Sequence, residues 1–322
     1  MLLENLYEKI TEKKSINKEE AFFLLNLKDN SLEKLFLYAS KIREKFCGHN
    51  VHCCSIVNAK SGKCSEDCSF CAQSAHNKAE SQTYPLLSKK ELLKAFAEAE
   101  KSPASCFSIV TSGKGVISEK EFEIILEVLK EVKWKGKSAS LGIISKEQAL
   151  KLKEVGLEKY HHNLETAESF FPKMCTTHSY QDRLQTVLNV KDAGLKVCCG
   201  GIFGLGESNT ERVELAMAIK DLRVDSVPLN FIHALKGTKI YRQRDPIKTT
   251  DIFKIIAMFR FILPDMTIGV MGGREKNLKE HQGNIFKAGA NSILIGNYLV
   301  TSGNQVEDDL NMIKKAGLKV KV

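Results

Sequence analysis

Three cysteines, Cys64, Cys68 and Cys71, are separated by three and then two residues in a polar stretch that contains a glycine. Thiolates this close along the chain can converge on one metal centre. Structural zinc takes four protein ligands and cubane iron–sulfur clusters are usually held by four cysteines. The set therefore implies either a further ligand from elsewhere or an iron left open for a small molecule. A zinc knuckle completed by His76 is the alternative, although zinc ligands usually come as two spaced pairs.

The same stretch resembles the cluster loop of the radical S-adenosylmethionine (SAM) enzymes, whose pattern is C-x3-C-x2-C with an aromatic residue before the last cysteine, here Phe70. In that superfamily the three cysteines hold a [4Fe-4S] cluster, and its fourth iron binds the amino and carboxylate groups of SAM. The wider sequence at 58–62 and 71–74 is similar to the biotin synthase family in particular. The resemblance covers the chain from about residue 51 to about residue 300.

Length and composition restrict the class of protein. The 322 residues suffice for two average domains or one large α/β barrel. No apolar run approaches the roughly 20 residues of a membrane helix, and the amphipathic first 14 residues contain acids, so we expect a cytoplasmic protein. The 10 cysteines then indicate reduced thiols that serve as metal ligands rather than disulfides. The net charge of +9 comes from basic residues interspersed with acidic ones, which is typical of a solvated surface and not of a nucleic-acid site.

Short apolar runs alternate with amphipathic segments from residue 51 onward. The expected strands are 51–58, 105–111, 138–143, 159–164, 195–203, 225–232, 266–271 and 292–295. The expected helices are 88–101, 118–133, 145–155, 180–193, 209–222, 250–263 and 278–288. Ser88, Ser118 and Ser145 have the position and type of helix N-caps. Eight strands that alternate with helices predict parallel βα repetition.

A closed barrel and a doubly wound sheet would give a similar alternation. Polar and thiol residues inside several strands favour the (β/α)8 TIM-type barrel, because a substrate enters such a barrel at its mouth. The resemblance to radical SAM enzymes implies the same fold. We expect an N-terminal helical extension at 1–50, the α/β barrel at 51–300, and a C-terminal helix and tail at 301–322.

Further cysteines lie within the expected strands, among them Cys54 in the first, Cys106 in the second and Cys198 in the fifth. One such cysteine is as easily a small buried hydrophobic residue. Several that point into one barrel could meet, and thiolates that meet in a reduced protein bind metal. The resemblance implies an auxiliary iron–sulfur cluster that donates sulfur, with Cys106 and Cys198 matching two of its usual ligands. The cysteines left as structural are Cys47, Cys53 and Cys175.

Two usual ligands of that cluster are missing, because Ser138 stands where the family has a third cysteine and Gly269 where it has an arginine. The chain gains thiols in compensation: Cys54 replaces a hydroxyl residue beside the arginine position, and Cys199 is a fourth ligand if a bulge turns it inward. The expected ligands are Cys54, Cys106, Cys198 and Cys199. Ligation by cysteine alone would suit a cubane-type cluster rather than a [2Fe-2S] one.

A glycine-rich turn follows the fifth expected strand. Such a turn lets the backbone approach a ligand closely, although a tight turn alone explains it equally well. The sequence resembles the radical SAM motif G-x-I-x-G-x-x-E, in which the backbone and the isoleucine contact the adenine of SAM. The matching residues are Gly200, Ile202, Gly204 and Glu207.

Polar residues near other strand ends gain a role only from the resemblance. Asn163 and Glu165 alternate to the same face of the fourth strand. The resemblance implies that Asn163 and Asn230 bind the cyclic urea of the substrate through their amides, and that Glu165 binds the ribose hydroxyls of SAM. It also places Arg183 near the SAM carboxylate.

The neighbouring His161 and His162 are expected to be ordinary polar packing residues. Adjacent strand positions face opposite sides, so the two rings cannot share one metal.

The activity that the resemblance implies is conversion of dethiobiotin to biotin. An electron from the first cluster would cleave SAM to methionine and a 5′-deoxyadenosyl radical. This radical would remove hydrogen from carbon 9 of dethiobiotin, sulfide would be captured, and a second SAM would activate carbon 6 to close the ring. No side chain need act as a general base, so no catalytic side chain is assigned.

The resemblance further implies a flavodoxin or ferredoxin-type reductant and a homodimer. One alternative is a radical SAM enzyme with another substrate, supported by the changes at Ser138 and Gly269. The other is a non-catalytic iron–sulfur or zinc protein that binds a partner. The amides Asn163 and Asn230 and the glycine-rich turn count against that second alternative.

Overall fold

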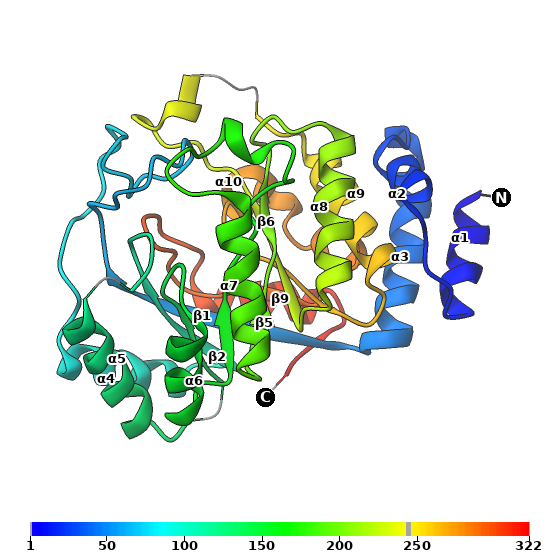
Figure 1. Cartoon of the computed structure of the whole chain (residues 1–322). Helices are drawn as coiled ribbons and strands as arrows, with labels where there is room; N and C mark the ends of the chain where they lie inside the picture. Colours follow the sequence, from blue (N-terminus) through cyan, green and yellow to red (C-terminus); the bar gives the residue numbers. More distant parts are fainter. Residues whose placement is uncertain (1, 117, 135, 243–245, 322) are drawn as a thin grey trace.

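Parallel strands close into a barrel at the centre of the computed structural model, which describes residues 2–116, 118–134, 136–242 and 246–321 (Figure 1). The barrel strands are β1 (Asn50–Lys60), β2 (Cys106–Thr111), β3 (Lys137–Ser140), β4 (Lys159–His161), β5 (Lys196–Cys198), β6 (Gly201–Phe203), β7 (Ser226–Phe231), β8 (Thr267–Val270) and β9 (Ser292–Leu294). Pairing is parallel in the order β1, β2, β3, β4, β5, β7, β8 and β9, with β6 also paired to β7, and β9 pairs with β1 to close the sheet. The predicted TIM-type barrel is confirmed, with its fifth expected strand divided into β5 and β6.

Helices follow the strands and cover the outside of the barrel (Figure 1). They are α4 (Lys89–Glu100), α5 (Glu119–Glu131), α6 (Lys146–Glu154), α7 (Tyr180–Asp192), α8 (Asn209–Leu222), α9 (Thr249–Ile262), α10 (Arg274–Leu278) and α11 (Asn284–Lys287). The serines Ser88, Ser118 and Ser145 cap three of them, since each side chain accepts a hydrogen bond from the backbone N–H three residues later. Short 3-10 turns lie at Asp29–Ser31, Phe171–Lys173, Lys239–Arg242 and Lys279–His281.

The helix expected at 278–288 is not continuous. The backbone leaves helical geometry at Lys279, whose φ is +46°, and a 3-10 turn separates α10 from α11. A residue with this positive φ cannot continue a right-handed helix. The apolar residues of the segment therefore belong to two short helices, α10 and α11.

Three helices precede the barrel: α1 (Leu2–Thr11), α2 (Lys18–Leu25) and α3 (Leu32–Cys47). They lie on one side of the barrel, where α2 contacts α8 and α9 and α3 contacts α9 (Figure 1). Both faces of α9 are buried as a result. Within the described residues, the helices are all too short or too polar to cross a bilayer.

The C-terminal segment returns to the barrel. Helix α12 (Val306–Lys315) is anchored through Asp309, whose carboxylate accepts hydrogen bonds of 2.9 and 3.0 Å from the buried Arg274. A final strand, β10 (Lys319–Val320), pairs in parallel with the start of β1. The tail therefore extends the sheet at the end where the barrel strands begin.

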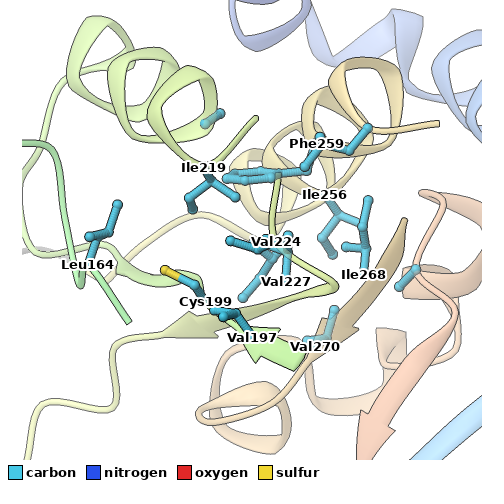
Figure 2. Packing of buried hydrophobic residues seen from close by; sticks show 14 of the residues in the cluster. Leu164, Val197, Cys199, Ile219, Val224, Val227, Ile256, Phe259, Ile268 and Val270 are labelled. Carbon is cyan, nitrogen blue, oxygen red and sulfur yellow. The ribbon is translucent and has the colours of Figure 1, made fainter. Parts of the chain in front are cut away.

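The hydrophobic core lies between the outer face of the strands and the helices. Figure 2 shows Val197 and Val227 from the strands, and Cys199 directly after β5, packed with Ile219 and Phe259. Alternate strand residues point to opposite faces. The residues between these positions therefore face the barrel interior, where the chemistry is concentrated.

Candidate active site

A cavity of about 1200 Å³ occupies the barrel interior. Its walls include two sets of thiols, one from the loop after β1 and one from the strands. The loop set is Cys64, Cys68 and Cys71, and the strand set is Cys54, Cys106 and Cys198. Both sets therefore face one space that is large enough for small molecules between them.

Hydrogen bonds from the Asn77 side chain and between backbone groups hold the cysteine loop in shape. The Nδ2 atom of Asn77 donates to the backbone oxygens of Cys68, at 3.1 Å, and of Cys71, at 2.7 Å. The backbone N–H of Cys64 donates to the backbone oxygen of Gln73 at 2.9 Å. Sequence reasoning missed Asn77, for which the signal was an amide residue six positions after the last cysteine. The loop is thus positioned by its own polar residues to present three thiols.

The histidine of the zinc alternative is directed elsewhere. Nε2 of His76 lies 2.9 Å from the backbone oxygen of Ser65, and the ring is on the exposed side of the loop. This placement counts against a zinc knuckle that includes His76.

A second group of side chains adjoins the loop from the segment after β4. The Sγ atoms of Cys68 and Cys175 are 3.7 Å apart, and Nδ1 of His178 lies 3.2 Å from Cys175 and 2.6 Å from Glu66. Hydrogen bonds from Cys68 and His178 outweigh burial and lower the pKa of Cys175 to about 4. Cys175 is buried as expected, but its place beside Cys68 was missed; the C-x2-H spacing to His178 was the available signal.

Two residues expected to contact SAM, Glu165 and Arg183, form one network at the cavity wall with Asn163, which was expected to bind the substrate. The guanidinium of Arg183 donates to Oε1 of Glu165 at 3.0 Å and to the backbone oxygen of Asn163 at 2.6 Å. The amide of Asn163 donates to Glu165 at 3.3 Å. Glu165 has a φ of +69°, a region that side-chain-bearing residues avoid, and such strain is often found at functional sites.

The glycine-rich turn contributes one side chain to the cavity and otherwise shapes the backbone. Ile202 lines the cavity, as does Phe70 from the cysteine loop. Gly204 has a φ of +87°, and its N–H donates to the buried carboxylate of Glu207 at 2.9 Å. Gly200 is in close contact with the backbone of Pro228 and leaves no room for a side chain. Gly200, Gly204 and Glu207 thus position the turn that carries Ile202.

The two amides expected to bind substrate, Asn163 and Asn230, both line the cavity. Each also bonds to the backbone: Oδ1 of Asn163 accepts from Gly200 at 3.1 Å, and Oδ1 of Asn230 accepts from Gly272 at 2.9 Å. These bonds fix which edge of each amide is presented to the cavity.

The strand thiols come from three separate strands. Cys54 and Cys106 are partners in the β1–β2 register. A hydrogen bond from Cys54 lowers the pKa of Cys106 although burial opposes this. For Cys198 burial also opposes ionisation, but the His161 ring and the Lys159 ammonium lower its pKa. The same Cys54–Cys106 hydrogen bond raises the pKa of Cys54, so the surroundings favour the thiolate form at Cys106 and Cys198 only.

The two substituted positions have other partners. Ser138 is fully buried, with its hydroxyl 3.1 Å from Sγ of Cys106 and donating to the backbone oxygen of Phe107 at 3.0 Å. The space beside Gly269 is filled by the side chain of Met271. Ser138 is therefore engaged in hydrogen bonds and the space beside Gly269 is packed, so neither position supplies a substitute cluster ligand.

The expectation that Cys199 joins the strand thiols is wrong. Its side chain points away from the barrel interior and packs with Leu164 and Val227 in the core (Figure 2). No bulge turns it inward, since Cys198 and Cys199 keep the alternation of an extended strand. Cys53 is likewise buried in that core, as expected, while its neighbour Cys54 lines the cavity.

His161, expected to be an ordinary packing residue, lies in the cavity wall beside a strand thiol. His161 is the register partner of Cys198 and lines the cavity. Burial disfavours its protonated ring, but the neighbouring Cys198 and Cys106 raise its pKa to about 10. His162 has different neighbours, Arg183 among them, and burial lowers its pKa.

Comparison with solved structures shows the same fold in distant proteins. Methylornithine synthase superposes with a TM-score of 0.86 at 19% sequence identity, covering 98% of this chain and 97% of that one. A maturase of the [FeFe]-hydrogenase superposes with a TM-score of 0.83 at 18% identity, covering 99% and 76% of the two chains. At these identities the likeness concerns the fold alone.

Sequence comparison is more specific. The radical SAM superfamily model matches residues 59–219, and the model of the biotin and thiamin synthesis associated domain matches residues 228–319. A biotin synthase of Citrifermentans bemidjiense is 49% identical over 99% of this chain and 97% of its own. A biotin synthase of Pelotomaculum thermopropionicum is 48% identical over the full length of both. The chain therefore belongs to the radical SAM superfamily and, within it, to the biotin synthase family.

Proposed function

We propose that the protein inserts sulfur into dethiobiotin to form biotin, with SAM as the source of the radical. The observation that carries this proposal is one cavity walled by two thiol sets, in a chain nearly half identical to named biotin synthases along its whole length. A reaction that needs a radical source and a sulfur source at one substrate requires both to face the same space.

The loop thiols fit a [4Fe-4S] cluster. Cys64, Cys68 and Cys71 are free, line the cavity and lie on a loop that amide hydrogen bonds hold in place. Such a cluster would supply the electron that cleaves SAM. Burial raises the pKa of Cys64 and Cys71, so these thiols gain their thiolate form through the metal itself.

The neighbouring polar network fits SAM. Glu165 presents a carboxylate that suits the ribose hydroxyls, and Arg183 places a guanidinium suited to the SAM carboxylate close to the cysteine loop. Ile202 and Phe70 offer apolar surface for the adenine. The buried wall keeps water away from a radical that would otherwise be quenched.

Dethiobiotin would lie between the two thiol sets. Asn163 and Asn230 each carry a donor and an acceptor, which match the N–H and C=O groups of a cyclic urea. Their backbone hydrogen bonds orient the amides before the substrate arrives. These residues bind and orient the substrate, and no side chain is required to act as a general base.

The strand thiols fit the auxiliary cluster that donates sulfur. Cys54, Cys106 and Cys198 line the cavity, and neighbouring donors lower the pKa of two of them. Because Cys199 lies in the core, three cysteines replace the four that the sequence suggested. A cubane-type cluster remains the preferred assignment, with three of its four ligand positions supplied by these cysteines.

The remaining expectations rest on the family. We expect a flavodoxin or ferredoxin-type reductant, a homodimer and a cytoplasmic location. Family membership favours an enzyme over a non-catalytic metal protein.

Anaerobic reconstitution with iron and sulfide, followed by incubation with SAM, dithionite and dethiobiotin, tests the function. We expect 5′-deoxyadenosine and biotin, both measured by mass spectrometry, and a rise in SAM cleavage when dethiobiotin is added. SAM cleavage without biotin, at any dethiobiotin concentration, would favour a radical SAM enzyme with another substrate.

A further inference from the structure

A buried nitrogen in the cavity wall has no protein partner. Nε2 of His161 is inaccessible to solvent and has no hydrogen-bond partner among the residues that the structure describes. Leaving a buried polar atom unpaired costs about 1–3 kcal/mol, so such atoms in native proteins usually meet a water, a ligand or an ion. Nε2 of His162 is also unpartnered, but its strand position faces away from that of His161 and of the register partner Cys198. An imidazole nitrogen is among the commonest metal ligands in proteins.

The neighbours of this ring are the strand thiols. His161 is the β4 partner of Cys198 on β5, and paired residues of adjacent strands project to the same face of a sheet. Cys106 on β2 lines the same cavity as His161. His161 thus stands between two of the thiols assigned to the auxiliary cluster.

The other positions that could complete the set are occupied or point away. Ser138, on the intervening strand β3, uses its hydroxyl in a hydrogen bond to Phe107. Met271 fills the space beside Gly269, and Cys199 packs in the core. Three cysteines leave one ligand position of a cubane to be filled.

We infer that His161 is the fourth protein ligand of the auxiliary cluster, through a ring nitrogen, in a set completed by Cys54, Cys106 and Cys198. The inference rests on the proposed function, because that function supplies the cluster. The ligands come from β1, β2, β4 and β5, so closure of the barrel assembles them. A neutral imidazole makes the cluster one charge less negative than four thiolates would, and histidine ligation raises reduction potentials.

Pulsed EPR tests this ligation directly. The sample is the Cys64→Ala/Cys68→Ala/Cys71→Ala protein, which lacks the loop cluster. It is produced with ¹⁵N-histidine or with natural histidine, reconstituted with iron and sulfide, and then reduced. We expect a strong hyperfine coupling between a histidine nitrogen and the cluster. The coupling should be that of ¹⁴N with natural histidine and that of ¹⁵N with the labelled histidine. Adding His161→Cys should keep iron and sulfide unchanged, abolish the coupling and lower the reduction potential. His162→Asn is the matched control and should leave the coupling unchanged.

Each other outcome overturns the inference. A cluster without nitrogen coupling, or a coupling that survives His161→Cys, excludes His161 as a ligand and leaves biotin formation untouched. Absence of any cluster from the loop variant overturns both His161 ligation and the auxiliary cluster of the proposed function. The first measurement uses the unchanged His161, so it does not depend on the folding of the His161→Cys variant.

Discussion

The two thiol sets face one cavity but are built in opposite ways. Cys64, Cys68 and Cys71 come from a single loop, which is held by hydrogen bonds of its own residues, Asn77 among them, and by contacts with the segment around Cys175. The strand thiols come from β1, β2 and β5, and face one cavity because these strands belong to one barrel. A local site tolerates change elsewhere in the fold, whereas a site assembled from strands depends on the register of several of them.

Their electrostatics differ as well. Burial raises the pKa of Cys64 and Cys71 in the loop. In the barrel, neighbouring donors lower the pKa of Cys106 and Cys198 despite burial. The pKa of Cys54 is raised by its hydrogen bond to Cys106, so the thiolate form is favoured at two of the three strand cysteines and disfavoured at Cys64 and Cys71.

Removing one loop thiol should have the largest effect. Cys71→Ala takes away one of three ligands of the cluster that binds SAM, so SAM cleavage should fall below detection. Iron should drop by about four per chain, the content of one cubane. Cys53→Ala, which removes a thiol from the core, is the control and should retain cleavage. Substantial SAM cleavage by Cys71→Ala would contradict the loop assignment.

Removing one strand thiol should abolish biotin formation without abolishing SAM cleavage. Cys198→Ala should keep reductive cleavage of SAM but form no biotin, because the sulfur source is lost while the radical source remains. The neighbouring Cys199→Ala should form biotin, since Cys199 lies in the core. Mass spectrometry of 5′-deoxyadenosine and biotin compares the Cys198→Ala and Cys199→Ala variants. Biotin formation by Cys198→Ala together with its loss in Cys199→Ala would reverse the assignment.

The SAM network should show an intermediate effect. Arg183→Lys keeps the charge but loses the paired contacts to Glu165 and Asn163. Loss of a charged hydrogen bond of about 1.5–3 kcal/mol corresponds to a rise of roughly 10- to 100-fold in the Kd for SAM. Equilibrium binding by the reconstituted enzyme measures it, and Lys191→Arg on the same helix is the control. An unchanged Kd would remove Arg183 from the SAM site.

Loosening the cysteine loop should weaken cluster retention. Asn77→Ala removes both hydrogen bonds to the backbone of Cys68 and Cys71. Outer-shell changes of this kind typically cost about 10- to 100-fold in metal affinity. Release of iron to a chelator should accelerate from the loop cluster, with the strand cluster unaffected. Equal acceleration from both clusters would show that the two sites are not independent.

The smallest effect is expected at Ser138. Ser138→Ala removes a buried hydrogen bond to Phe107 and should lower the free energy of unfolding by about 1 kcal/mol. Iron content and biotin formation should stay the same, since Ser138 is not assigned as a ligand. Urea unfolding of the apoprotein measures the first effect. A loss of about four iron atoms per chain would instead make Ser138 a ligand.

The local features of the molecule were predictable from sequence. The spacing of Cys64, Cys68 and Cys71 needs no knowledge of the fold, and serine caps such as Ser145 are signalled within four residues. The alternation of strands and helices predicted the barrel, although the interruption at Lys279 left no clear signal.

Features that depend on long-range register were not predictable. Whether Cys198 or Cys199 faces the cavity depends on the phase of one short strand, and both choices suit the sequence. The placement of His161 beside Cys198 follows from the β4–β5 pairing, which spacing along the chain does not encode. The contact of Cys175 with Cys68 likewise joins segments more than 100 residues apart.

Iron and sulfide analysis with Mössbauer spectroscopy on two reciprocal variants tests most directly whether the barrel holds two independent thiol sites. One variant replaces the three loop cysteines with alanine, and the other replaces Cys54, Cys106 and Cys198. We predict about eight iron atoms per unmodified chain and about four in each variant, with distinct spectra. A loop variant without any iron–sulfur signal would contradict the second site.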